Sequence, residues 1–235
     1  MQKSDLVVGF STGCLFKTHN ILEALPVIRE TGCNAVELNL LRTHDFFHFI
    51  EKITPEDIAS FSYVSMHAPK FDCGKTEETE LIFRAIELFH AQRPLDLIAF
   101  HPNHVTDFSV FNTAAFPLAF ENLDYREESG IYRTVDGMRI LFEKFPATPM
   151  VFDLNHVYTL DASMKLAKTF YLTLGKRIRQ IHLSGCRDYY HYPLFKTKQD
   201  SIIRAIQDKT TPIIIESVLE AKELAKELSY IQKRL

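Results

Sequence analysis

The sequence predicts an α/β fold, a single (β/α)8 TIM barrel in one domain that spans residues 1–235. Two observations support this fold. Short runs rich in β-branched and aromatic residues alternate with amphipathic stretches of helical spacing, and strict alternation indicates parallel strands joined by helical crossovers. There are eight such strand–helix pairs within 235 residues, which is the size of a TIM barrel, and no linker rich in Pro or Ser divides them.

The eight expected strands are short apolar runs, the pattern of a sheet that is buried on both faces. In chain order they cover residues 6–10, 35–40, 63–67, 95–101, 118–121, 149–153, 178–182 and 212–216.

The expected helices follow from apolar spacing and from residues that favour helix ends. The first begins at Asn20, a good N-cap, and stops at Gly32, while Pro55 suits the first position of a new helix start within the second unit. Asp161 is expected to cap the sixth helix, and Gly175 to end it. The helical stretches cover residues 20–31, 44–61 in parts, 76–92, 109–115, 135–145, 161–174, 199–208 and 220–233.

The fourth strand–helix unit is the weak point of the series. The stretch up to Pro117 has room only for the short helix over 109–115, so an abbreviated fourth unit is expected. An open doubly wound sheet is the alternative architecture. It is less favoured because Ser11-Thr12-Gly13, after the first strand, does not match the G-x-G-x-x-G phosphate loop.

Composition excludes several classes of protein. Lys and Arg number 27 against 30 Asp and Glu, a formal charge of -3, which excludes a strongly basic nucleic-acid coat protein but not a local basic patch. With only 8 Gly and 10 Pro, the chain is not collagen-like or of low complexity. The 10 His stand out, because histidine is the commonest metal ligand and titrates near neutral pH.

The cysteines and the first residues indicate a cytoplasmic protein. Cys14, Cys33, Cys73 and Cys186 form no C-x-x-C pair, so we interpret them as free thiols in a reducing compartment. Residues 1–5 are polar, and the apolar run that follows them is too short for a signal peptide or a membrane span. We expect no membrane association, and the sequence leaves open whether the chain forms an oligomer.

Six consecutive predicted strands end in an ionisable residue. These residues are His67, His101, Glu121, Asp153, His182 and Glu216. Active sites of TIM barrels lie at the C-terminal ends of the strands, so the fold would bring all six to one mouth. A single polar residue of this kind usually marks only the point where a strand meets solvent, but six in succession indicate a site.

The chemistry of these residues predicts a metal centre. Glu121, Asp153 and Glu216 would place three carboxylates in one low-dielectric mouth, where they raise each other's pKa or need cations. Two loop histidines, His156 and His191, add imidazole ligands, and this mixture suits Zn²⁺, Mn²⁺ or Fe²⁺ better than Ca²⁺. Eight candidate ligands exceed the needs of one ion. We therefore expect one to three divalent ions (Zn, Mn, Fe or Mg).

Six short motifs carry a family resemblance. They are Ser65-Met-His67-Ala, Phe100-His101-Pro-Asn, Phe120-Glu121-Asn122, Phe152-Asp153-Leu-Asn-His156, Ile181-His182-Leu-Ser and Ile215-Glu216-Ser217. In this order the set resembles the xylose isomerase-like TIM barrels, a superfamily that includes sugar epimerases, inosose dehydratases and endonuclease IV-type enzymes. The Glu-Asn pair and the Asp-x-x-His motif are the most specific pieces.

The resemblance implies a ligand set for each branch of the superfamily. Isomerases and epimerases hold one metal with residues that match Glu121, Asp153, His182 and Glu216. Endonuclease IV-type enzymes add ligands that match His67, His101, His156 and His191. Tyr189 stands where that branch has an Asp, and Asp188 is one place away, so the third metal and the residue that replaces the Asp stay open.

Three functions are compatible with this site. The first is a metal-dependent isomerase or epimerase of a sugar or sugar phosphate, in which the metal polarises a carbonyl or hydroxyl and the catalytic pair Glu121 and Glu216 moves the proton. The second is a phosphoesterase with two or three metal ions, and DNA is a partner only under this hypothesis, although the loops carry few of the cations that DNA binding needs. The third, a non-catalytic barrel that binds a metal or ligand, is disfavoured by the intact glutamates.

Further residues are expected to contact the substrate, a small molecule such as a sugar or a phosphorylated sugar. Some lie where TIM barrels often bind phosphate, and others are loop cations or neighbours of the predicted ligands. The resemblance includes a Glu on the second strand, for which a buried, paired role is equally compatible. The candidates are Glu37, Asn122, Lys70, Arg187, Ser184 and Ser217.

Overall fold

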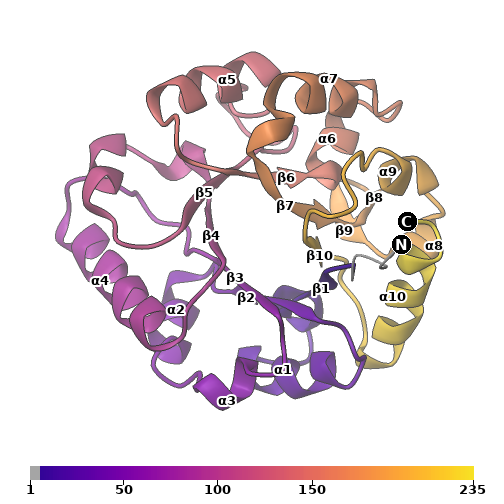
Figure 1. Cartoon of the computed structure of the whole chain (residues 1–235), viewed down its shortest axis with the longest axis horizontal. Coiled ribbons are helices and arrows are strands. Elements are labelled where there is room, and N and C mark those ends of the chain that lie inside the picture. The colour runs from indigo at the N-terminus through magenta and orange to yellow at the C-terminus, as the bar shows by residue number, and fades with distance from the viewer. Residues whose placement is uncertain (1–5) are drawn as a thin grey trace.

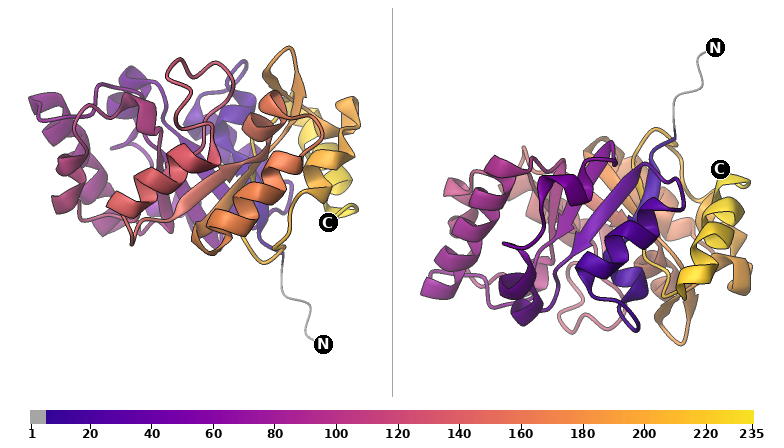
Figure 2. Two further views of the ribbon diagram at one scale, coloured as in Figure 1. Left: turned by 90° about the horizontal axis from the view of Figure 1, so that it is seen from above. Right: turned by 90° about the horizontal axis from the view of Figure 1, so that it is seen from below.

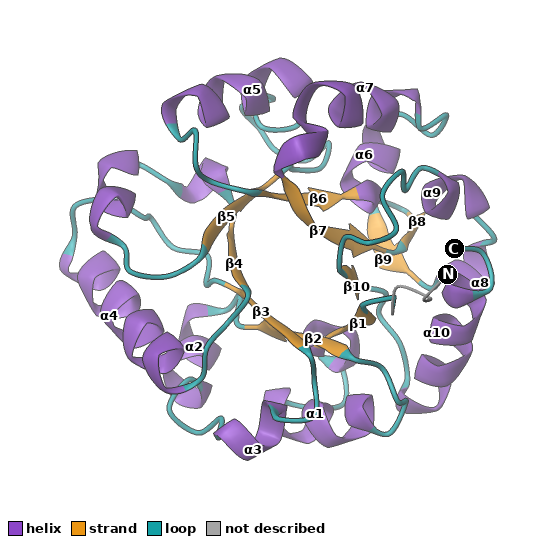
Figure 3. Cartoon of the chain, in the orientation of Figure 1, coloured by secondary structure: helices purple, strands orange, loops and turns teal. Residues whose placement is uncertain are grey.

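Eight parallel strands form a closed barrel in this computed structural model, which describes residues 6–235. The polar residues 1–5 lie outside the described part of the chain. The strands follow the order β1-β10-β7-β6-β5-β4-β3-β2 around the barrel. Figure 1 shows this ring of strands with the helices arranged around it, and Figure 3 separates the two layers by colour. The predicted α/β class and (β/α)8 TIM barrel are confirmed.

Each barrel strand overlaps one predicted strand. Their bounds are β1 Val8–Ser11, β2 Ala35–Asn39, β3 Tyr63–His67, β4 Leu97–Phe100, β5 Leu118–Glu121, β6 Met150–Asp153, β7 Ile178–Leu183 and β10 Ile213–Ile215. The strands are short and mostly buried, as their continuous apolar runs predict. His101 and Glu216 each lie one residue beyond the end of their strand, so both begin the loops that surround the barrel mouth.

The helices form the outer layer of the molecule (Figure 2). Their bounds are α1 Ile21–Arg29, α2 Thr43–Phe49, α3 Pro55–Ile58, α4 Glu77–Gln92, α5 Val135–Lys144, α6 Leu154–Leu160, α7 Lys165–Leu174, α8 Leu194–Thr197, α9 Asp200–Arg204 and α10 Leu224–Gln232. Asn20 caps α1 through a reciprocal capping box with Glu23, as its side chain predicts. None of the helices formed by residues 6–235 is long and apolar enough to cross a bilayer.

Two 3-10 helices occupy the connection between β4 and β5. They are η2, Pro102–His104, and η3, Phe108–Thr113. The ring of Phe111 on η3 lies 5.3 Å from that of Phe83 on α4, 5.2 Å from that of Phe100 on β4 and 5.5 Å from that of Phe120 on β5. This aromatic cluster covers the outer side of the barrel where no long helix is present.

The segment after β6 differs from the sequence expectation. Residues 154–160 were expected to form a loop, but they form α6, because the Asp153 side chain caps it by accepting a hydrogen bond from the His156 backbone N–H at 2.9 Å. The next helix, α7, begins at Lys165 rather than at 161. Met164 has a positive φ of 58°, which a continuous helix does not allow, although Asp161 still accepts a bond from the Leu166 N–H at 2.8 Å.

A β-hairpin follows β7, which the sequence analysis did not predict. Strands β8, Gly185–Arg187, and β9, Tyr190–Tyr192, pair antiparallel through a turn at Asp188 and Tyr189, with φ of 51° and 63°. Positive φ at both turn positions is what the hairpin twist requires, although Gly or Asn usually provides it. Figure 2 shows the hairpin on the same side of the barrel as the loop after β5. The hairpin carries His191.

Buried Glu227 on α10 joins three elements at the end of the chain. Its carboxylate accepts hydrogen bonds from the N–H groups of Leu194 and Phe195 at the start of α8, at 2.7 and 2.9 Å. It also accepts one from the hydroxyl of Ser217, in the loop after β10, at 2.7 Å. A carboxylate that satisfies three buried donors in this way holds α8, α10 and this loop together.

We predict that Glu227→Gln lowers the free energy of unfolding by about 1–3 kcal/mol, because an amide cannot accept all three bonds and leaves a buried donor unpaired. Urea denaturation measures this difference. Glu80→Gln, at an exposed position on α4, is the matched control and should stay within about 0.5 kcal/mol of the wild type. Equal stability of the two variants would show that Glu227 does not hold these elements together.

Candidate metal centre

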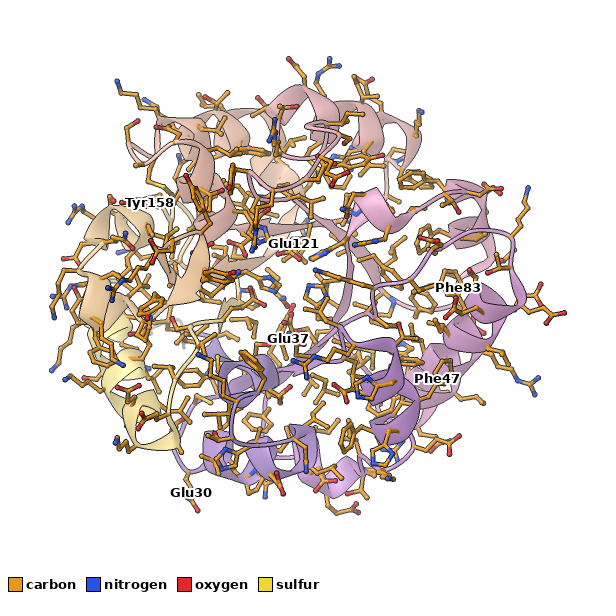
Figure 4. All side chains as sticks on the ribbon, turned by 180° about the vertical axis from the view of Figure 1, so that it is seen from behind. Glu30, Glu37, Phe47, Phe83, Glu121 and Tyr158 are labelled. Carbon is orange, nitrogen blue, oxygen red and sulfur yellow. The ribbon has the colours of Figure 1, made fainter. Side chains whose placement is uncertain are left out.

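A cavity of about 820 Å³ opens at the C-terminal ends of the barrel strands. Six of the eight predicted ligands line it, namely His67, His101, Glu121, His156, His191 and Glu216. The other two, Asp153 and His182, are fully buried beneath it. In Figure 4 the labelled Glu121 lies inside the ring of strands, whereas Glu30 lies at the outer edge of the molecule. The fold thus brings all eight residues to one place.

The eight side chains form three groups whose potential ligand atoms lie within 4.8 Å of one another. The groups are His67, His101 and Glu121; Glu121, Asp153, His182 and Glu216; and Asp153, His156 and His191. Because Glu121 and Asp153 each belong to two groups, the three groups form one connected cluster.

In the first group, two histidines converge on one carboxylate oxygen. The Nε2 atoms of His67 and His101 each lie 3.0 Å from Oε2 of Glu121. Nδ1 of His67 lies 3.3 Å from the carbonyl oxygen of Ala68, to which it can donate, so that Nε2 is left as the ligand atom. Burial lowers the pKa of His101 to about 3, which keeps this imidazole neutral, as a metal ligand must be.

In the second group, a single imidazole lies between two glutamates. Nδ1 of His182 lies 3.0 Å from Oε1 of Glu121 and 3.4 Å from Oε2 of Glu216. Asp153 pairs with His182 across β6 and β7, and its Oδ2 atom is buried without a hydrogen-bond partner. A buried carboxylate oxygen without a partner is costly, and a bound cation would satisfy it.

In the third group, backbone and hydroxyl contacts orient the two histidines. Nδ1 of His156 donates to the Asn122 carbonyl at 2.7 Å, which leaves Nε2 directed toward Oδ2 of Asp153 at 3.4 Å. Nδ1 of His191 lies 2.9 Å from the Ser184 hydroxyl. Burial lowers the pKa of His191 to about 4, so this imidazole is also neutral.

Neither residue considered for the missing aspartate of this third group lies in it. The Asp188 side chain is 87% exposed and lies beside Arg187. The Tyr189 ring stacks on Tyr125 of the loop after β5, with 4.0 Å between ring centroids. Asp153 is the carboxylate that completes the group.

The two glutamates of the second group have pKa values shifted in opposite directions. Burial would raise the pKa of Glu121, but His182 and His101 hold it well below its usual range. Burial raises the pKa of Glu216 well above its usual value, and the negative charges of Glu37, Glu121 and Asp153 add to this against the attraction of His182. Such a divergence is typical of an acid/base pair.

The charge balance of the cluster fits divalent cations. Over residues 6–235, the ion pairs made by Glu37, Glu121, Asp153 and Glu216 are with histidines, and none is with Lys or Arg. Four carboxylates, several imidazoles and a buried carboxylate oxygen without a hydrogen-bond partner form a donor set that could hold a divalent metal ion.

Of the six residues predicted to contact substrate, only Lys70 lines the cavity. Asn122 is buried and holds the backbone of Asp153, with its Oδ1 accepting from the Asp153 N–H at 2.8 Å. Ser184 and Ser217 are fully buried and bond to His191 and Glu227. These three residues therefore support other side chains and do not face the cavity.

The remaining two predicted substrate contacts also lie away from the cavity wall. Arg187 is exposed on the hairpin, over the ring of Tyr192. Glu37 is fully buried and bonds to His182.

The sequence patterns did not single out several residues that lie around the site. Gln180 is buried beside Glu37 and His182, and its position two residues before His182 placed it on the same strand face. His104, the last residue of η2, and Glu127, in the loop after β5, also line the cavity. His104 follows His101 by three residues, a spacing that could have indicated it.

Comparisons with solved structures match the whole fold. One is a D-allulose 3-epimerase from Methylomonas sp. in complex with D-allulose, with 13% identity, a TM-score of 0.66, and coverage of 98% of this chain and 97% of that one. A second is an AP endonuclease of family 2 from Brucella melitensis, with 11% identity, a TM-score of 0.65, and coverage of 96% and 98%.

A third match is the IolI protein with a bound zinc atom, with 10% identity, a TM-score of 0.65, and coverage of 96% of each chain. A scan against family models and a search of curated proteins gave no match. The structural matches, which also include a xylose isomerase domain-containing protein from Salmonella typhimurium, agree over nearly the full length of the barrel. The chain therefore has the fold of the xylose isomerase-like TIM barrels.

Proposed function

We propose that this protein is a divalent-metal-dependent isomerase or epimerase that acts on a sugar or a sugar phosphate. The observation that carries the proposal is the pair Glu121 and Glu216, which flank Nδ1 of His182 at 3.0 and 3.4 Å and both line the cavity. A pair of carboxylates at one cavity wall can remove a proton from a substrate carbon and return it. The structural match to an epimerase with a bound sugar supports this substrate class.

Glu121, Asp153, His182 and Glu216 are the residues proposed to hold the metal ion of this reaction. Zn, Mn, Fe and Mg are the candidate ions, and the zinc bound by the IolI match supports a divalent metal ion in a barrel of this fold. The ion would supply Lewis-acid polarisation of a substrate carbonyl or hydroxyl group.

The two glutamates divide the proton transfer between them. In this proposal Glu121 accepts a proton at a carboxylate oxygen, and Glu216 delivers the proton that is returned. Removal on one face of the carbon and return on the other inverts its configuration without a net change in atoms. The near-complete burial of Glu121 keeps bulk water away from this exchange.

The rim of the cavity favours an anionic or polar substrate. Lys70, with Lys17 and Arg42, lines the wall outside the metal cluster, where these cations could contact a phosphate. The cytoplasm stays the proposed compartment, in keeping with four cysteines that are free in the structure.

A multi-metal phosphoesterase of endonuclease IV type is the second candidate. The observation that favours it is the group of His67, His101 and Glu121, because single-metal isomerisation does not require these two histidines. With the third group, His156, His191 and Asp153, the cluster offers ligands for up to three ions. The match to an AP endonuclease supports this alternative, under which a phosphoester, including DNA, is the substrate.

Metal content tests both candidates. We expect protein reconstituted with Zn²⁺ or Mn²⁺ and then dialysed to retain at least one equivalent per chain by elemental analysis, because the cluster holds unneutralised carboxylates. One ion per chain favours the isomerase, and two or three favour the phosphoesterase. Retention of less than one equivalent would contradict both functions.

Proton transfer tests the proposed roles of the glutamates. In D₂O, a sugar or sugar phosphate that is turned over should acquire solvent deuterium at the reacting carbon, which NMR detects. Glu216→Gln should lower this exchange by about 10²-fold or more, because an amide cannot exchange the proton. Glu80→Gln on α4 is the control and should leave the rate unchanged. An unchanged rate in Glu216→Gln would refute its role.

A further inference from the structure

We infer that Glu37 is a positioning residue, which holds the N–H of His182 on Nε2 so that Nδ1 is the atom offered to a metal ion. This inference rests on the proposed metal site and concerns the residue beneath it. Figure 4 shows Glu37 inside the barrel, like Glu121.

The contact links two strands that are not neighbours. Glu37 lies on β2 and His182 on β7, and β10 and β1 separate these strands in the barrel. Oε2 of Glu37 lies 2.8 Å from Nε2 of His182, and both side chains are fully buried. The bond therefore crosses the barrel interior, on the opposite side of the imidazole from Glu121 and Glu216.

The direction of this bond follows from its chemistry. An ionised carboxylate can only accept, so Nε2 must carry the hydrogen. An imidazole that binds a metal ion is neutral and keeps a single N–H, so the lone pair then lies on Nδ1, the atom that faces Glu121 and Glu216. The partner of one ring nitrogen in this way determines which nitrogen can bind metal.

Glu37 is itself held by donors. Nε2 of Gln180 donates to its Oε2 at 2.8 Å, and the Ser65 hydroxyl lies 3.4 Å from the same oxygen. The Tyr63 hydroxyl donates to Oε1 of Gln180 at 2.9 Å, which fixes the amide with its NH₂ toward Glu37. Nε2 of Gln180 also lies 2.7 Å from Nε2 of His182, so the two nitrogens approach the same Glu37 oxygen side by side.

This role explains why a carboxylate stands at position 37, where its burial costs free energy. A carboxylate buried in the barrel interior costs free energy unless charged or hydrogen-bonded groups compensate it, and an apolar residue there would cost nothing. Glu37 is absent from the cavity wall, so it does not contact a substrate there. The hydrogen bond to His182 instead gives the buried Glu37 carboxylate a role in orienting a proposed metal ligand.

The test compares metal affinity and the protonation of His182 in four proteins. Glu37→Met removes the acceptor at similar volume, and Glu37→Gln keeps a neutral acceptor. Zn²⁺ affinity from chelator competition should fall about 10–100-fold in Glu37→Met and less in Glu37→Gln. Glu80→Gln replaces an exposed carboxylate on α4, and its affinity should stay within about twofold of the wild type.

Nitrogen-15 NMR of the histidine rings gives a second readout that does not depend on activity. With Zn²⁺ bound, the wild type should show His182 protonated at Nε2 and bound through Nδ1, and Glu37→Met should lose this pattern. Unchanged affinity and an unchanged His182 signal in Glu37→Met, in a wild type that binds Zn²⁺, would overturn the inference alone. A wild type that binds no Zn²⁺ would overturn the proposed function, and this inference with it.

Discussion

The Glu121 carboxylate is the interaction on which the rest of the site depends. One of its oxygens lies 3.0 Å from both His67 and His101, and the other lies 3.0 Å from His182. These residues come from four strands, or the loops directly after them, and a single buried carboxylate connects them. Each of these contacts requires the parallel strands from β3 to β7 to lie side by side, because no local segment brings these residues together.

The barrel supplies this convergence through its backbone, and buried polar groups then refine it. Asp153 illustrates both levels, since its side chain caps α6 while its neighbour Asn122 holds its backbone. The cap orients the first turn of α6, which carries His156 back toward the cavity. One residue therefore serves the fold and offers an oxygen to two of the potential metal groups.

The fold and the set of ionisable residues at the barrel mouth could be predicted from the sequence, because both depend on patterns along the chain. Alternating strands and helices define the barrel, and residues at strand ends must share its mouth. The partners of the buried polar residues could not be predicted. Ser184 and Ser217 stand at positions typical of phosphate binding, but their hydroxyls bond to His191 and Glu227, contacts that depend on long-range packing.

Segments whose conformation depends on a few unusual residues could not be predicted from the sequence either. Asp188 and Tyr189 make the turn of the β8–β9 hairpin with positive φ, a conformation that their residue types rarely adopt. The sequence predicts that Glu37 lies on the second strand. It does not indicate the hydrogen bond to His182, because the two residues are 145 positions apart. Only the closed barrel reveals such a pair.

The central claim is that the side chains around Glu121 form a metal centre. Anomalous diffraction from crystals grown with Zn²⁺, measured at the zinc absorption edge, tests this claim most directly. If these side chains hold a metal ion, we expect an anomalous-difference peak for zinc among Glu121, Asp153, His182 and Glu216. No peak at this position, or zinc bound only at surface histidines, would contradict it.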